Sequence, residues 1–259
     1  MSETLLDVRC LTSGYGKTPI VRDISLTVDA GEVVVLLGPN GAGKSTTLRA
    51  ISNLLPAMKG EVVFRGESRT KLAPHLLARS GLAHLPEGRG IFYGLTVAEH
   101  FGLQSRRAGA KDFARALQYF PELGRLEKRI AGQLSGGEQQ MLALARTLAR
   151  APRLLLIDEL SLGLAPRIVE RLMPVLRDYA DDAGAGVLLV EQHVDLALSI
   201  ADRGYVLTHG SIGPAKSSAD LREHHDEIVA RYLGLDVVSG SGGAAPVRQP
   251  TPTHIEGVR

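Results

Sequence analysis

The sequence has little of several residue types that mark particular classes of protein. It contains no tryptophan, one cysteine and only 4% aromatic residues among its 259. A lone cysteine, Cys10, cannot form an internal disulfide, so the composition favours a reducing cytoplasm. We expect Cys10 to pack as a small hydrophobic residue near a strand.

Long hydrophobic runs and strong charge are also absent. The longest apolar stretches, Val33–Leu37, Leu154–Ile157 and Val187–Val190, have the length of buried strands and fall far short of the roughly 18 residues that span a bilayer. No basic region leads into an apolar stretch at the N-terminus, so we expect no signal peptide. The net charge of +2 gives no electrostatic reason to expect a nucleic-acid partner.

The apolar pattern predicts one α/β domain. Apolar and polar residues alternate through the first thirty positions (Leu6, Val8 and Cys10, then Ile24, Leu26 and Val28), which is typical of half-buried antiparallel strands. From Val33 the pattern becomes a continuous apolar strand, followed by a glycine-rich turn and a helix over about 44–54. That order opens a parallel α/β core. Further short strands are expected at 61–65, 81–84, 154–157, 187–190 and 205–208, with helices at 167–180 and 194–201.

Residues 88–150 differ from the core on either side. Between Gly88 and Ala131 the strand signal disappears, and helices are expected over 96–105, where Thr96 and Glu99 form a capping box, and over 112–120. A longer helix follows over about 136–150. We therefore interpret 88–150 as a helical insertion in a domain spanning 4–235. The tail 236–259, rich in Gly, Ser, Pro and Thr, is expected to be disordered.

GPNGAGKST, from Gly38 to Thr46, fits the pattern of a phosphate-binding loop at every fixed position. Small residues let backbone N–H groups close on a triphosphate, and the helix that begins at Lys44 directs its positive dipole end at the same charge. Lys44 is expected to reach the β- and γ-phosphates of ATP, and Ser45 to coordinate Mg²⁺. The loop residues predicted to contact nucleotide are Gly38, Pro39, Asn40, Gly41, Ala42, Gly43, Lys44, Ser45 and Thr46.

LLLIDE, from Leu154 to Glu159, is an apolar strand that ends in two acids. A buried parallel strand delivers its last side chains to the sheet edge where ligands bind in open α/β folds. We expect Asp158 to hold Mg²⁺ through its hydration shell and Glu159 to act as the general base on the attacking water.

LSGGEQQ, from Leu134 to Gln140, precedes that strand by about twenty residues. Ser135, Gly136 and Gly137 expose N–H groups at a helix start and so predict a second anion site, which one ATP does not need from the same subunit. The loop is therefore expected to cover the γ-phosphate held by a partner subunit. An ordinary Ser N-cap is the alternative.

Together the phosphate loop, LSGGEQQ and LLLIDE resemble the nucleotide-binding subunits of ATP-binding cassette (ABC) transporters over roughly residues 4–235. The resemblance implies a P-loop NTPase core with a mainly parallel sheet, an antiparallel N-terminal β subdomain and an inserted α-helical subdomain. It also implies head-to-tail dimers, of this chain with itself or with a sister ATPase, that enclose two ATP molecules.

The resemblance assigns roles to residues outside the three motifs. Tyr15 matches the aromatic residue that stacks on adenine, although it would otherwise be an ordinary turn tyrosine. Glu87 stands where most cassettes carry a Gln that senses Mg²⁺ and the membrane partner. Gln192 occupies the place of the usual γ-phosphate-sensing His, but a shift of one residue would give that role to His193, so both are retained.

PEGRGIF, LTVAEH, SLGLAP and VEQ resemble the ATPases of branched-chain amino acid importers and of related urea and amide importers. That subgroup implies integral membrane permease subunits, an extracytoplasmic solute-binding protein and a place on the cytoplasmic face of the membrane. An ATPase for lipid or polysaccharide export and a non-transport cassette ATPase of DNA repair or translation are the alternatives.

Overall fold

The computed structural model describes residues 3–103 and 106–223, and within them the alternating N-terminal segments form an antiparallel sheet. This sheet has the strand order β2-β1-β4-β5. Its strands are β1 (Thr4–Tyr15), β2 (Thr18–Asp29), β4 (Ala57–Phe64) and β5 (Glu67–Ser68). The expected antiparallel pairing of the first two segments is confirmed.

Cys10 lies in β1, but the expectation that it packs as a small hydrophobic residue is wrong, because its side chain is exposed. The registers of β1 with both neighbours shift at this point, and Cys10 has a φ of 47°. This irregularity breaks the alternation, so that Leu11 follows Leu6 and Val8 into the core. Gly60 faces the irregularity, and a Cβ there would lie 2.3 Å from the Cys10 carbonyl oxygen.

The second sheet has the order β10-β9-β3-β8-β7-β6, with β11 also paired to β9. Its parallel strands are β3 (Val33–Leu37), β6 (Leu82–Leu85), β7 (Leu154–Asp158), β8 (Gly186–Val190) and β9 (Arg203–Thr208). The short strands β10 (Ser211–Ile212) and β11 (Lys216–Ser217) run antiparallel to β9. Every residue of β3, β7 and β8 is buried, as expected for strands covered on both faces.

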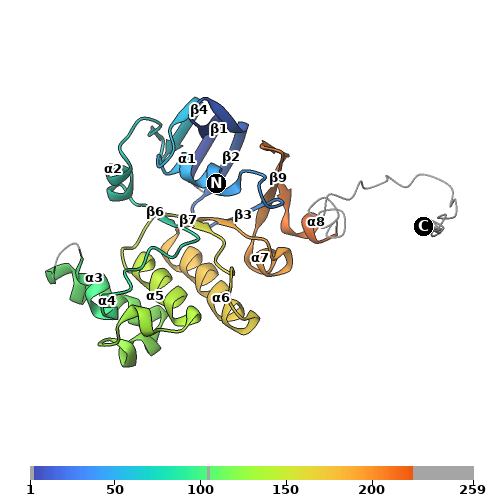
Figure 1. Ribbon diagram of the computed structural model, residues 1–259. Helices are drawn as coiled ribbons and strands as arrows, with labels where there is room; N and C mark the ends of the chain where they lie inside the picture. Colours follow the sequence, from blue (N-terminus) through green and yellow to red (C-terminus); the bar gives the residue numbers. More distant parts are fainter. Residues whose placement is uncertain (1–2, 104–105, 224–259) are drawn as a thin grey trace, which may run out of the picture.

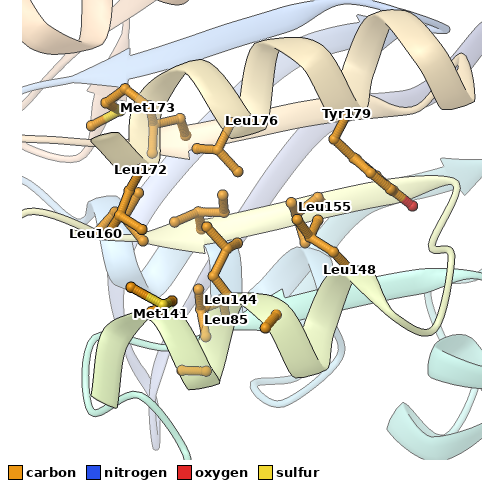
Figure 2. Close-up of a cluster of buried hydrophobic side chains, with 14 of the residues drawn as sticks. Leu85, Met141, Leu144, Leu148, Leu155, Leu160, Leu172, Met173, Leu176 and Tyr179 are labelled. Atoms are coloured by element: carbon orange, nitrogen blue, oxygen red, sulfur yellow. The ribbon is translucent and has the colours of Figure 1, made fainter. Parts of the chain in front are cut away.

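Successive side chains of these strands enter two different cores. Val34 and Leu36 pack with the antiparallel sheet and α1 (Lys44–Ile51), whereas Val33, Val35 and Leu37 face the opposite core. In Figure 2, side chains of α5 (Gly136–Leu148) and α6 (Pro166–Ala183) meet on β7. The parallel sheet is therefore the central layer, with the antiparallel sheet and α1 on one side and α5 and α6 on the other (Figure 1).

The remaining helices are α2 (Pro74–Arg79), α3 (Val97–Gly102), α4 (Arg106–Tyr119), α7 (Val194–Ile200) and α8 (Ser218–Glu223), with 3₁₀ turns at Pro121–Leu126 and Ala131–Gln133. Three of them, α3, α4 and α7, correspond to predicted helices with shifted bounds. The capping box is confirmed, because Thr96 Oγ1 accepts from the Glu99 backbone at 3.3 Å and Glu99 Oε2 accepts from the Thr96 backbone at 2.7 Å. Helices α2 and α8 and the strands β5, β10 and β11 were not predicted from the sequence.

The described residues of 88–150 are helical or irregular, apart from an isolated bridge between Thr96 and Ile130. The α/β fold class is confirmed, whereas the bounds of the insertion and of the 4–235 domain stay predictions. The tail 236–259 lies outside the described residues. Among the residues that the structure describes, no helix is both long and apolar enough to cross a membrane.

Candidate active site

The ends of four parallel strands bring most of the predicted site residues to one sheet edge. Strand β8 lies between β3 and β7, and its last residue, Val190, pairs with Leu36 on one side and with Asp158 on the other. The phosphate loop follows β3, the two acids end β7, and Gln192 comes shortly after β8. Glu87 follows β6, the other neighbour of β7. This edge is where ligands bind in open α/β sheets.

The glycines of the loop after β3 permit unusual backbone conformations and close packing against a neighbouring strand. Gly41 and Gly43 have φ values of 78° and 107°, a region that favours glycine. A Cβ at Gly38 would lie 2.3 Å from the Leu207 carbonyl oxygen, so the loop packs directly on β9. No side chain caps the N-terminus of α1. An uncapped helix start at the end of a glycine loop fits a phosphate group.

Lys44 places a buried positive charge over this loop. Only 5% of the residue is exposed, and Nζ donates to the carbonyl oxygens of Gly38 at 2.8 Å and Pro39 at 3.2 Å. Burial lowers the pKa of Lys44, and the charges of Glu159, Asp158 and Glu191 oppose that shift. The ammonium group is a hydrogen-bond donor whose positive charge is supported by nearby carboxylates. Such a group fits a contact with phosphate oxygens.

Ser45 and Asp158, the two predicted Mg²⁺ ligands, are in direct contact. Ser45 Oγ donates to Asp158 Oδ1 at 3.0 Å, across 113 positions of sequence. Burial raises the pKa of Asp158, and the charges of Glu159 and Glu87 raise it further, so a cation here would relieve an unfavourable concentration of negative charge.

The donor set fits Mg²⁺. The described residues contain no cluster of three or more His, Cys, Asp or Glu side chains that would enclose a metal. Mg²⁺ in nucleotide sites is bound by one or two protein oxygens together with phosphates and waters, so a hydroxyl and a carboxylate suffice. Glu87 is exposed in the loop after β6, close enough for its charge to act on Asp158.

Glu159, the predicted base, contacts only one of the two candidate sensors. Gln192 Nε2 donates to Glu159 Oε2 at 2.8 Å, whereas His193 is exposed and forms the N-cap of α7. The other oxygen of Glu159 lies 3.9 Å from Lys44 Nζ. Glu159 also has a φ of 52°, which is an uncommon conformation for a residue with a side chain and is found at functional sites.

Tyr15 lies at the end of β1 with half of its surface exposed. Its hydroxyl oxygen accepts from Arg49 Nη1 at 2.9 Å, which ties the tyrosine to α1, the helix that follows the phosphate loop. An exposed ring held in this way is available to stack on a base.

Ser135, Gly136 and Gly137 form a separate group at the start of α5. Ser135 Oγ accepts from the Glu138 backbone at 3.3 Å, and the Ser135 backbone donates to Glu138 Oε2 at 2.8 Å. The N-cap that was the alternative explanation of this serine is therefore present. Ser135 and Gly136 are nevertheless exposed, so this helix start remains accessible from outside the chain.

Sequence reasoning missed two contacts near the site. Arg89 donates to Gln140 Oε1 at 2.9 Å and to Gln139 Oε1 at 2.8 Å, which joins the loop after β6 to the LSGGEQQ helix. Glu191, fully buried at the end of β8, accepts hydrogen bonds from Ser161. An acid directly after an apolar strand was the available signal for Glu191, the same signal that identified Asp158.

Comparison with known proteins gives consistent matches. Residues 21–161 match the family described as ABC transporter. The chain is 41% identical, over 85% of its length and 95% of the relative's, to the high-affinity branched-chain amino acid transport ATP-binding protein BraG of Pseudomonas aeruginosa. It is 36% identical, over 83% of its length and 92% of the relative's, to the probable branched-chain amino acid transport ATP-binding protein LivF of Archaeoglobus fulgidus.

A protein of an export system matches at lower identity. The lipopolysaccharide export system ATP-binding protein LptB of Escherichia coli is 32% identical over 89% of this chain and 98% of its own length. Among solved structures, an ATP-binding subunit of an ABC transporter superposes with a TM-score of 0.76 at 28% identity, covering 88% of this chain and 99% of that one.

Proposed function

Since the chain belongs to the ABC transporter family and is an ATPase of that family, we propose that it powers the uptake of branched-chain amino acids or a related small polar solute. The observation that carries the proposal is the identity to BraG, a branched-chain amino acid transport protein, over 85% of this chain and 95% of BraG. ATP hydrolysis is supported by the arrangement at one sheet edge, where the glycine loop, the two acids and Gln192 follow neighbouring strands.

The nucleotide would lie along the ends of β3, β8 and β7. Tyr15 would stack on adenine, the backbone N–H groups of Gly38 and of Asn40–Thr46 would surround the phosphates, and Lys44 would neutralise the β- and γ-phosphates. Mg²⁺, bound through Ser45 and Asp158 with Glu87 nearby, would offset negative charge on the phosphate oxygens.

Glu159 is the proposed general base. Its carboxylate would take a proton from a water whose oxygen attacks the γ-phosphorus, while the bond to the bridging oxygen of ADP breaks. Gln192, hydrogen-bonded to Glu159 at 2.8 Å, would orient that carboxylate and sense the γ-phosphate. His193 would contact neither Glu159 nor the γ-phosphate.

The proposed working unit is a dimer in which the exposed loop Ser135–Gly137 of one cassette covers the ATP of the other, a sister chain or a second copy. Membrane permease subunits would dock on the loop Glu87–Leu95, where Phe92 and Tyr93 are 56% and 60% exposed. The chain would then lie on the cytoplasmic face of the membrane, and an extracytoplasmic binding protein would deliver the solute. No nucleic acid is part of the proposal.

Uptake of radiolabelled leucine by cells that lack this gene tests the proposal. The wild-type chain should restore uptake and Glu159→Gln should not, while Glu170→Gln on the exposed face of α6 serves as the charge-matched control. Unchanged leucine uptake in the deletion strain, together with a defect in lipid or polysaccharide export, would contradict import and favour the export alternative.

A further inference from the structure

Glu191 is a fully buried acid at the edge that holds the candidate active site, yet none of the roles above uses it. It directly follows β8 and precedes Gln192. A buried carboxylate is costly unless hydrogen bonds compensate for its lost hydration. The donors that surround Glu191 therefore indicate what it does.

Ser161 supplies most of that compensation. Its backbone N–H donates to Glu191 Oε1 at 2.9 Å and its hydroxyl donates to Oε2 at 2.5 Å. The Gln192 backbone also donates to Oε2, at 3.3 Å. Burial raises the pKa of Glu191, and these hydrogen bonds, in all of which Glu191 is the acceptor, oppose that rise.

These contacts close a ring around the proposed base. Ser161 stands two positions after Glu159 in the loop between β7 and α6, and Gln192 stands one position after Glu191. Gln192 Nε2 returns to Glu159 Oε2 at 2.8 Å. Two hydrogen-bonded contacts, Ser161 with Glu191 and Gln192 with Glu159, thus join two loops that lie about 30 positions apart in sequence.

The ring of contacts holds the backbone of Glu159 in an uncommon conformation. Glu159 has a left-handed φ of 52°, a conformation that persists only where surrounding contacts hold it. The Glu159 backbone donates to the Val190 carbonyl oxygen at 2.9 Å, and Ser161, two residues later, is fixed to Glu191. The backbone on both sides of Leu160 is therefore attached to the end of β8.

We propose that Glu191 and Ser161 are a positioning pair that aligns the carboxylate of Glu159 with the amide of Gln192 for ATP hydrolysis. The pair does not touch the nucleotide. It sets the relative position of the loop that carries the base and the loop that carries the sensor. This inference rests on the proposed function, since it assumes that Glu159 is the base.

Steady-state ATP hydrolysis by the full chain tests the pair. Ser161→Ala removes the hydroxyl donor, and Glu191→Gln replaces the charge and one acceptor oxygen. Each should lower kcat by roughly 10- to 100-fold, because small displacements of a catalytic group cost rates of that order. The KM for ATP and the affinity for an ATP analogue should stay within about twofold, because phosphate contacts are kept.

Rescue and non-additivity separate positioning from a general loss of structure. Ser161→Thr keeps the hydroxyl and should recover most of the wild-type kcat. The double variant Ser161→Ala/Glu191→Gln should have a kcat no lower than that of the more impaired single variant, because both substitutions act on one interaction. Matched controls are Ser199→Ala and Glu170→Gln, which change an exposed serine and an exposed glutamate on the neighbouring helices.

Wild-type kcat in Ser161→Ala, or equal losses in Ser161→Ala and Ser161→Thr, would overturn the pair. A raised KM at unchanged kcat would also overturn it. If Glu191→Gln does not fold, the two Ser161 variants carry the test alone. Failure of the proposed base is a different result, because Glu159→Gln would then hydrolyse ATP like the wild type.

Discussion

At the scale of single residues, the carboxylate of Glu159 lies at the centre of the candidate site. One of its oxygens accepts from Gln192 Nε2 at 2.8 Å, and the other lies 3.9 Å from Lys44 Nζ. An amide donor orients a carboxylate without neutralising it, so Glu159 can remain a base. His193, one position further, is exposed at the start of α7.

Side-by-side substitution of the two candidate sensors follows from this geometry. Gln192→Ala removes the amide that orients Glu159 and should lower ATP turnover by about tenfold or more. His193→Ala removes an exposed ring and should change turnover by less than about twofold. Steady-state hydrolysis at saturating ATP measures both, and nucleotide affinity provides the control.

A larger loss in His193→Ala than in Gln192→Ala would reverse the assignment. Two variants with wild-type turnover would show that neither residue senses the γ-phosphate.

At the scale of secondary-structure elements, β6 and α1 are joined by a half-buried histidine. His84 Nδ1 lies 2.9 Å from the hydroxyl of Ser52 at the end of α1, and His84 Nε2 is buried without a hydrogen-bond partner. Burial, and secondarily the charge of Arg49, lower the pKa of His84 to about 4. The imidazole is therefore neutral at pH 7, and protonating it would place a charge between the two elements.

A pH-dependent loss of stability follows. Because the folded pKa of about 4 lies below the unfolded value of about 6.5, the unfolded chain takes up the proton first. The stabilisation is complete above pH 6.5 or so and is lost as the pH falls towards 4. Between pH 7.5 and 5 the free energy of unfolding should fall by roughly 2 kcal/mol more in the wild type than in His84→Asn.

Urea denaturation at a series of pH values measures this difference. Asn keeps an amide donor near the Ser52 hydroxyl, and the exposed His75→Asn on α2 is the matched control. Parallel stability profiles of the wild type and His84→Asn would contradict a neutral His84 in the folded protein.

At the scale of the whole molecule, the parallel sheet explains why so much could be predicted from the sequence. Its strands β3, β7 and β8 are buried on both faces, so they read as continuous apolar runs, and the residues that follow each run must emerge at one edge. The contact of Ser45 with Asp158 and the nearness of Lys44 to Glu159 were predictable for that reason.

Features that depend on contacts across the fold were not predictable. The exposure of Cys10 depends on a strand irregularity opposite Gly60, which lies on another strand. The bond between Ser161 and Glu191 joins loops that periodicity does not relate, and Arg89 reaches the LSGGEQQ helix from 50 positions away. The functional roles of the site residues stay predictions.

Whether this arrangement hydrolyses ATP through Glu159 is the central claim, and Glu159→Gln is its most direct test. The substitution keeps the shape of the side chain and removes its ability to accept a proton, so ATP binding should stay within about twofold of the wild type while steady-state hydrolysis falls at least about 100-fold. Hydrolysis at the wild-type rate by this variant would contradict the account.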